Sequence, residues 1–206
     1  MNPVRWYGDA LALVTVRRPN AAPSPASLPA ATARPVRVVH VDTGGAPPVP
    51  GATTLRLPED IGRPAAINRA VAALDVGVGW VALADPQVVW GAGALDELLA
   101  AAARHPRAAL LGPAVGEGPV EWISTACVLL RRVAWDSVDG FDARHLDRGT
   151  DPEPADLDLC HRLGRAGWLC VGVPTAGVAV IATPATGMLE PHDRGLRRHV
   201  MPTRRD

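Results

Sequence analysis

The chain has 206 residues with 21 basic residues, all arginine, and 21 acidic residues, which gives a formal net charge of zero. This length suits one α/β domain with a real core, and the absence of a basic excess argues against a nucleic-acid-binding protein. Cys127, Cys160 and Cys170 are odd in number and lie in apolar runs. We interpret them as reduced core residues of a cytoplasmic protein.

Apolar, β-branched runs alternate with helical patterns through the first half of the chain. Strands are predicted at 10–16, 36–42, 53–57, 78–85 and 108–115, and helices at 62–74 and 91–106. Prolines limit residues 17–35 to a loop with at most a turn or two. This alternation predicts an α/β fold: an open, mostly parallel, mixed sheet with helices on both faces.

The second half is predicted to hold a long strand at 121–132, a short helix and turn at 133–142, and a helix that ends at Gly167. Residues 166–189 carry no charge and are long enough for a membrane span. Their prolines, glycines and threonines favour two buried strands joined by a turn instead.

A single domain is expected over residues 1–189, with a polar tail at 190–206. Residues 10–115 would bind one ligand, and residues 116–189 would complete the site. The first residues lack the basic-then-apolar layout of a secretion signal.

Acids lie at the ends of predicted elements, on the edge where open α/β sheets bind ligands. They are Asp42, Asp85 and Asp156. Each also has an ordinary structural explanation: Asp42 suits a turn before two glycines, Asp85 suits a strand end before a proline, and Asp156 suits a helix cap. Asp158 is explained equally well by the favourable position of an acid in the first turn of a helix.

Three longer stretches carry a family resemblance. They are "VALADPQVVWGAGALDELLAAAARHPRAALLGPAV", "EWISTACVLLRRVAWDSVDGFD" and "ADLDLCHRLGRAGWLCVGVPTAGVAVI". In this order they resemble the family-2 glycosyltransferases of the GT-A fold, in particular actinobacterial rhamnosyltransferase-like members that build cell-wall polysaccharide. The resemblance covers roughly residues 10–185.

The resemblance implies transfer of a sugar from a nucleotide-diphosphate sugar to a polysaccharide or lipid-linked acceptor. That chemistry needs a carboxylate to take the proton of the acceptor hydroxyl. It also needs positive charge on the leaving diphosphate, usually from a divalent metal such as Mn²⁺ or Mg²⁺. By the resemblance, Asp156 is the catalytic base, and Asp85 is both a nucleotide-side residue and the first acid of the metal motif.

The same resemblance implies that residues 10–115 form a nucleotide-binding half and that residues 116–189 form an acceptor and catalytic half. It also assigns other residues to the two substrates. It implies that Thr15, Asp42 and Asn68 lie around the nucleotide. It implies that Asp158 and Trp168 lie on the acceptor side, although core packing explains Trp168 as readily.

The chain departs from the family pattern at residues that concern the metal and the base. Gln87 stands where the metal motif has its second acid, Val180 where the family has a histidine, and Ala155 where an acid precedes the base. A neutral amide is a poorer ligand for a hard cation. These departures therefore make metal binding less expected in this chain than in the family. Without a metal, Arg63 or Arg69 would carry the charge of the diphosphate.

Two hypotheses therefore follow from the sequence. The first is a working glycosyltransferase at the inner membrane face, held there peripherally because no transmembrane segment is expected. The second is a catalytically impaired relative that serves as a scaffold and binds a nucleotide sugar or a partner enzyme. A nucleotidyltransferase is disfavoured, because no glycine-rich, lysine-bearing phosphate loop follows the first strand.

Overall fold

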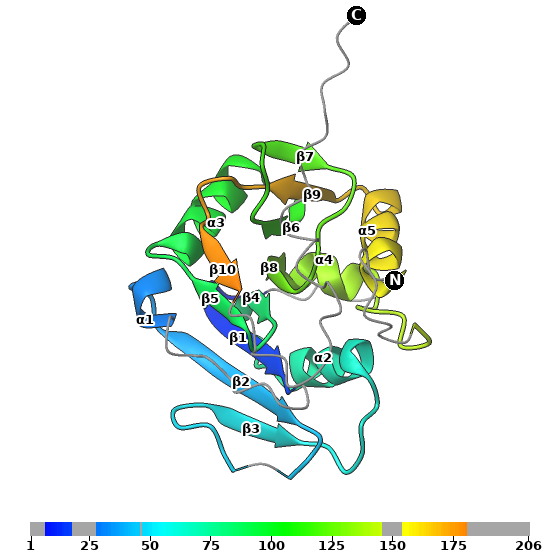
Figure 1. Cartoon of the computed structure of the whole chain (residues 1–206). Coiled ribbons are helices and arrows are strands. Elements are labelled where there is room, and N and C mark those ends of the chain that lie inside the picture. Colours follow the sequence, from blue (N-terminus) through cyan, green and yellow to red (C-terminus); the bar gives the residue numbers. More distant parts are fainter. Residues whose placement is uncertain (1–6, 18–27, 46, 146–153, 181–206) are drawn as a thin grey trace, which may run out of the picture.

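The computed structural model describes residues 7–17, 28–45, 47–145 and 154–180. Most of the strands form one eight-stranded sheet in the order β3-β2-β1-β4-β8-β6-β9-β7, and β5 and β10 form a second sheet (Figure 1). The strands are β1 (Ala10–Val16), β2 (Val36–Asp42), β3 (Thr53–Arg56), β4 (Val78–Ala84), β5 (Val88–Trp90), β6 (Ala108–Gly112), β7 (Gly118–Val120), β8 (Cys127–Arg131), β9 (Leu169–Gly172) and β10 (Val178–Val180).

The large sheet is mixed but mostly parallel, as predicted. Strand β1 pairs in parallel with β2 on one side and β4 on the other, and β2 pairs in parallel with β3. Strand β8 lies between β4 and β6 and is antiparallel to both. Strands β4 and β6 therefore point the same way, and the carboxyl ends of most strands meet at one edge, which we call the carboxyl edge.

Helices cover both faces of this sheet because its central strands are apolar on both sides. In β1, Leu11 and Leu13 face a core cluster shared with α1 (Leu28–Ala31) and α3 (Ala94–Arg104). Ala12, Val14 and Val16 face the other cluster, which contains residues of α2 (Arg63–Ala72), α4 (Arg132–Ser137) and α5 (Pro154–Arg165). Figure 1 shows the two groups of helices on opposite sides of the sheet.

Some predicted elements need correction. The strand predicted over 121–132 is confined to β8, since the chain enters the sheet only at Cys127. The short strands β5 and β7 were not predicted: each has only three residues, and β7 is an edge strand that contains Pro119.

In its described part, residues 166–180, the uncharged segment after α5 forms two strands, as expected, although β10 is not buried; residues 181–189 lie outside the described residues. The helix ends as predicted at Gly167, which has φ +86° and is followed by a Trp168 N–H bond to the carbonyl of Leu163. Strand β9 joins the large sheet, whereas β10 pairs with β5. In the described part of the chain, no helix has the length and apolar character that a membrane crossing requires. The predicted tail, 190–206, lies outside the described residues.

Candidate functional site

Polar side chains from four separate segments meet at the carboxyl edge. Asp85 directly follows β4, and Thr125 lies just before β8, which begins at this edge because it runs antiparallel to β4. Arg63 is the first residue of α2, and Asp156 lies in the first turn of α5. The backbone N–H of Asp85 donates to the carbonyl of Ala126 at 2.8 Å, which ties the first two segments together.

Asp156 is buried, with 2% of its surface exposed, and both of its carboxylate oxygens accept hydrogen bonds. The Thr125 hydroxyl donates to Oδ1 at 2.6 Å, and the Thr125 backbone N–H donates to Oδ2 at 2.9 Å. The Ser124 hydroxyl donates to Oδ2 at 3.3 Å. Burial raises the pKa of this carboxyl above its ordinary value, against the opposing influence of Arg63 and of these hydrogen bonds.

Arg63 connects Asp85 to Thr125. Its Nε donates to Asp85 Oδ1 at 3.0 Å, its Nη1 donates to Thr125 Oγ1 at 2.9 Å, and its Nη2 donates to the Thr125 carbonyl at 2.7 Å. The side chains of Arg63 and Asp85 are 12% and 20% exposed. A hydrogen-bonded series therefore runs Asp85–Arg63–Thr125–Asp156, and we call these residues the edge cluster.

A second polar group lies at the ends of β1 and β2. Thr15 and His40 are register partners, and the Thr15 hydroxyl is hydrogen-bonded to His40 Nδ1 at 2.9 Å. Arg17 forms an ion pair with Asp42, whose Oδ1 also accepts the Gly44 N–H at 3.1 Å. Burial lowers the pKa of His40 below its ordinary value. Thr15 and Asp42 thus lie together at the predicted nucleotide end, and Asp42 also forms its predicted turn.

Asn68 lies in the middle of α2 and holds the turn after α4. Its side-chain N–H donates to the Phe141 carbonyl at 2.8 Å, and its Oδ1 accepts the Phe141 N–H at 3.0 Å. Gly140, at φ +69°, is required here, because a Cβ would lie 2.7 Å from both Asn68 Oδ1 and the Trp135 ring. The amide of Asn68 is therefore engaged with the backbone of this turn.

The structure does not bring Asp158 or Trp168 to the edge cluster. Asp158 accepts a 2.7 Å bond from Arg162 one turn further along α5. Trp168 follows the other end of α5, a helix of 12 residues, and donates its indole N–H to Ser137 at 3.0 Å. It precedes the start of β9 and so lies at the opposite edge of the sheet from Asp156.

The residues at the expected metal site do not fit a divalent cation well. Asp85 is the remaining acid of the metal motif, and it is already paired with the guanidinium of Arg63. The next motif position is the amide of Gln87, which is a weaker ligand for a hard cation.

Another group of ionisable side chains lies beside α5. Carboxylate or imidazole atoms of Asp142, His145 and Asp158 lie within 4.8 Å of one another. However, Asp142 is held by Arg144, which lowers the pKa of that carboxyl, and Asp158 is held by Arg162. A cation would have to compete with both arginines.

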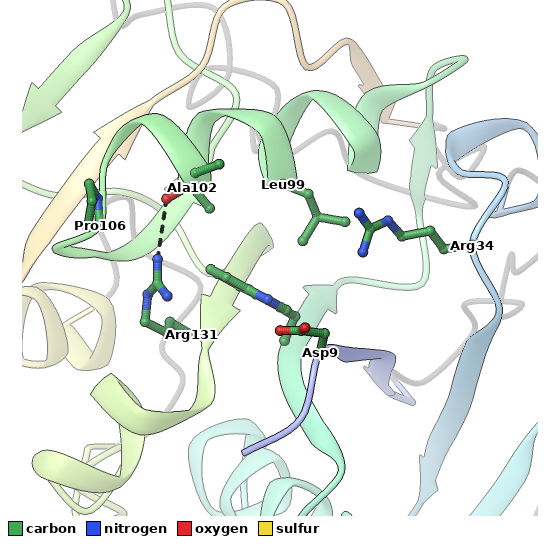
Figure 2. A pocket seen from close by; sticks show the side chains of 8 residues that line it. Asp9, Arg34, Leu99, Ala102, Pro106 and Arg131 are labelled. Atoms are coloured by element: carbon green, nitrogen blue, oxygen red, sulfur yellow. Dashed lines mark hydrogen bonds between the residues drawn. The ribbon is translucent and has the colours of Figure 1, made fainter. Parts of the chain in front are cut away.

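A cavity of about 440 Å³ lies at the other edge of the large sheet (Figure 2). It is bordered by α3, by Trp80 of β4 and by Arg131 at the end of β8. The Arg131 guanidinium lies 4.3 Å from the centre of the Trp80 ring and donates to the carbonyls of Ala102 and Ala108. This arginine therefore completes the end of α3, and the cavity is separate from the edge cluster.

Thr125 and His40 had no assigned role in the sequence-based prediction, and Arg63 was named there only as one of two arginines that could carry the charge of the diphosphate. Thr125 was hidden inside a predicted strand. His40 is a polar residue in an otherwise apolar stretch of β2, which is a recognisable signal. Arg63 lies in the first turn of a helix, where a cation is electrostatically unfavourable unless it has a partner, so its position was also a signal.

Comparison with known proteins identifies two relatives by sequence. No family model matches the chain. Two proteins of Mycobacterium tuberculosis, from strains CDC 1551 / Oshkosh and ATCC 25618 / H37Rv, are each named N-acetylglucosaminyl-diphospho-decaprenol L-rhamnosyltransferase. Each is 33% identical to this chain, and the match covers 79% of this chain and 72% of the relative.

Solved structures share the fold at low sequence identity. PcManGT, a mannosyltransferase from Pyrobaculum calidifontis in complex with GDP-Man and Mn²⁺, has a TM-score of 0.61 and 17% identity, and the match covers 84% of this chain and 57% of that chain. GalNAc-T7 with UDP, GalNAc and Mn²⁺ has a TM-score of 0.66 and 10% identity, covering 84% and 44%. S. aureus TarS has a TM-score of 0.60 and 11% identity, covering 82% and 59%.

The chain thus spans less than two thirds of these solved chains, and the structural likeness establishes the fold alone. The match to the mycobacterial relatives extends over most of both sequences. The chain belongs to the rhamnosyltransferase-like glycosyltransferases of the GT-A fold.

Proposed function

We propose that this protein transfers a sugar from a nucleotide-diphosphate sugar to a lipid-linked acceptor. The observation that carries the proposal is the edge cluster, which sets a buried carboxylate beside an arginine at the ligand-binding edge of a GT-A sheet. The mycobacterial relatives are named for a rhamnosyl transfer to a decaprenol-linked N-acetylglucosamine. A polyprenyl-diphosphate sugar is therefore the acceptor class that we expect.

Asp156 is the proposed base. The acceptor hydroxyl attacks the anomeric carbon, its proton passes to Asp156, and the bond from that carbon to the diphosphate oxygen breaks. Within the described part of the chain, Oδ1 of Asp156 accepts one bond, from Thr125, and a carboxylate oxygen has two lone pairs. A raised pKa increases the proton affinity of the carboxylate, which suits this role. Because Asp156 is almost fully buried, residues around it must shift before an acceptor reaches it.

The donor nucleotide is proposed to lie across the ends of β1, β2 and β4. Thr15 and Asp42 lie at the ends of the first two strands, and Asp85 follows the third. This arrangement follows the general rule that ligands of open α/β sheets bind outside the carboxyl ends of the strands. In the proposal, Asn68 supports this site indirectly, by holding the turn at Phe141.

A lipid-linked acceptor requires the protein to work at a membrane surface. We propose that it attaches there peripherally, since its fold is that of a nucleotide-sugar transferase and its relatives are named for a decaprenol-linked substrate.

A transfer assay tests the proposal. Purified protein is incubated with labelled nucleotide-diphosphate sugars and with decaprenyl-diphosphate N-acetylglucosamine, and label is counted in the extracted lipid. Transfer from at least one donor, and none with boiled protein, is the expected result. Nucleotide binding without any transfer would instead support the catalytically impaired relative, which the match to the rhamnosyltransferases does not favour.

A further inference from the structure

The ion pair between Arg63 and Asp85 bears on how the donor diphosphate is held. We infer that the guanidinium of Arg63 takes the place of a divalent cation, so that this protein binds the diphosphate of its donor without a metal. The inference rests on the proposed function. It adds which positive charge neutralises the leaving diphosphate.

The first step concerns the acid at the metal position. A divalent cation that bridges protein and diphosphate needs carboxylate or other oxygen ligands from the protein. Here Asp85 gives its Oδ1 to Arg63 Nε at 3.0 Å, and the motif continues with an amide, Gln87. A cation approaching Asp85 would meet a carboxylate that is already paired with a cation, and it would be repelled by the adjacent guanidinium.

The second step concerns the geometry of Arg63. A guanidinium is planar, always charged, and presents five N–H donors, so it can bridge several acceptors at once. Arg63 already bridges Asp85 on one side and the Thr125 hydroxyl and carbonyl on the other. Its side chain is 12% exposed, at the edge where the donor is proposed to bind. A guanidinium in this position bridges an acid and a phosphate as a metal ion would.

The third step distinguishes Arg63 from Arg69, the other arginine of α2. Arg69 lies in the last turn of the helix and is exposed. Arg63 lies in the first turn, where a cation opposes the helix dipole and therefore needs negative partners. Asp85 is one such partner, and a bound diphosphate would be another. Arg63 also favours the ionised form of Asp156, so one side chain influences both the donor side and the base.

Calorimetric titration with UDP, dTDP and GDP, in EDTA and then in Mn²⁺, tests the inference. The wild-type protein is expected to bind at least one of these nucleotides with similar affinity in both conditions. Arg63→Ala should weaken that binding about 10- to 100-fold, as expected for loss of a charge-assisted contact. Arg69→Ala is the matched control on the same helix and should bind like the wild type.

A second variant guards against a fold defect in Arg63→Ala. The double variant Arg63→Ala, Gln87→Asp rebuilds a pair of acids with no arginine between them. It should bind the nucleotide in Mn²⁺ and lose it in EDTA, a switch that a misfolded protein cannot show. Thermal unfolding of both variants by circular dichroism provides the check on folding.

The outcomes separate this inference from the proposed function. Wild-type binding that appears only with Mn²⁺ would overturn the inference and leave the proposed function standing. Equal binding by Arg63→Ala and the wild type would also overturn it. Absence of binding to every nucleotide in both conditions would remove the proposed function, and the inference with it.

Discussion

Thr125 holds the carboxylate of Asp156 with two bonds, one from its hydroxyl at 2.6 Å and one from its backbone N–H at 2.9 Å. The same hydroxyl and the carbonyl of Thr125 accept bonds from Arg63. A single buried residue therefore fixes the position of the proposed base relative to the proposed diphosphate-binding arginine. This relationship leads to predictions for each part of the site.

Asp156→Asn should lower the turnover rate about 10²- to 10⁴-fold, because the amide cannot accept the proton of the acceptor hydroxyl. Nucleotide affinity should stay close to that of the wild type, since Asn has nearly the same shape. The unfolding temperature should fall, because the amide nitrogen cannot accept the bonds that one of the two buried oxygens accepts now. The measurements are single-turnover transfer and calorimetry. Asp158→Asn is the control on the same helix and should have a smaller effect, since Asp158 is paired with Arg162 away from the cluster. Unchanged turnover in Asp156→Asn would remove this residue as the base.

Thr125→Val should reduce turnover by about tenfold or more, because the isosteric side chain lacks the hydroxyl that links Arg63 Nη1 to Asp156 Oδ1. Leaving those buried groups without this partner should also cost about 1–3 kcal/mol of stability. Thr125→Ser retains the hydroxyl and should recover most of the activity. If Val and Ser behave alike in the transfer assay, the hydroxyl has no part in positioning the base.

Asn68→Ala should destabilise the protein by about 1–3 kcal/mol, because the backbone N–H and carbonyl of Phe141 lose their side-chain partners. For a chain of this size, the melting temperature should fall by about 2–4 °C for each kcal/mol. Differential scanning calorimetry measures the shift, and exposed Arg69→Ala should stay within about 0.5 kcal/mol of the wild type. A melting temperature equal to that of the wild type would show that the turn is held by other contacts.

His40 should make the stability depend on pH in mildly acidic solution. Its folded-state pKa lies below the ordinary value of 6.5, chiefly because of burial, with Asp42 raising it and Arg17 lowering it. The unfolded chain therefore binds a proton more readily than the folded one. Its stabilising contribution is present above pH 6.5 and is lost as the pH falls below that value toward the folded-state pKa.

Urea unfolding of the wild type and of His40→Asn, between pH 7 and pH 5, isolates this contribution by difference. Asn can place a hydrogen-bonding group near the position of Nδ1 but does not titrate. The variant should therefore show a shallower loss of stability than the wild type. Parallel curves for the two proteins would mean that His40 titrates normally.

Much of the fold could be predicted from the sequence because strands such as 10–16 and 36–42 are mostly apolar runs, rich in β-branched residues, between turn-forming residues. The prediction was less accurate at 121–132, where an apolar run looks continuous although residues 121–126 stay outside the strand. In the structure, Ser124 and Thr125 lie in this part and bond to Asp156. The sequence pattern alone does not show which residues of this run pair within the sheet and which bond to Asp156 instead.

Only part of the site could be predicted, because only some of its residues carry a local sequence signal. Asp85 and Asp156 could be named because they follow local signals, the end of a strand and the start of a helix. The contact between Arg63 and Thr125 joins residues 62 positions apart, so no local pattern contains it. Trp168 looked suitable for the acceptor side from the motif alone, but the direction of β9 places it at the other edge.

The insertion of β8 between β4 and β6 has a consequence for how the chain assembles during synthesis. Strand β6 leaves the ribosome before both of its neighbours in the sheet, β8 and β9. Its two hydrogen-bonding edges therefore stay open until residues up to 172 have emerged. A fragment that stops near residue 115 would expose this apolar strand, so the nucleotide-binding half should aggregate when it is produced alone.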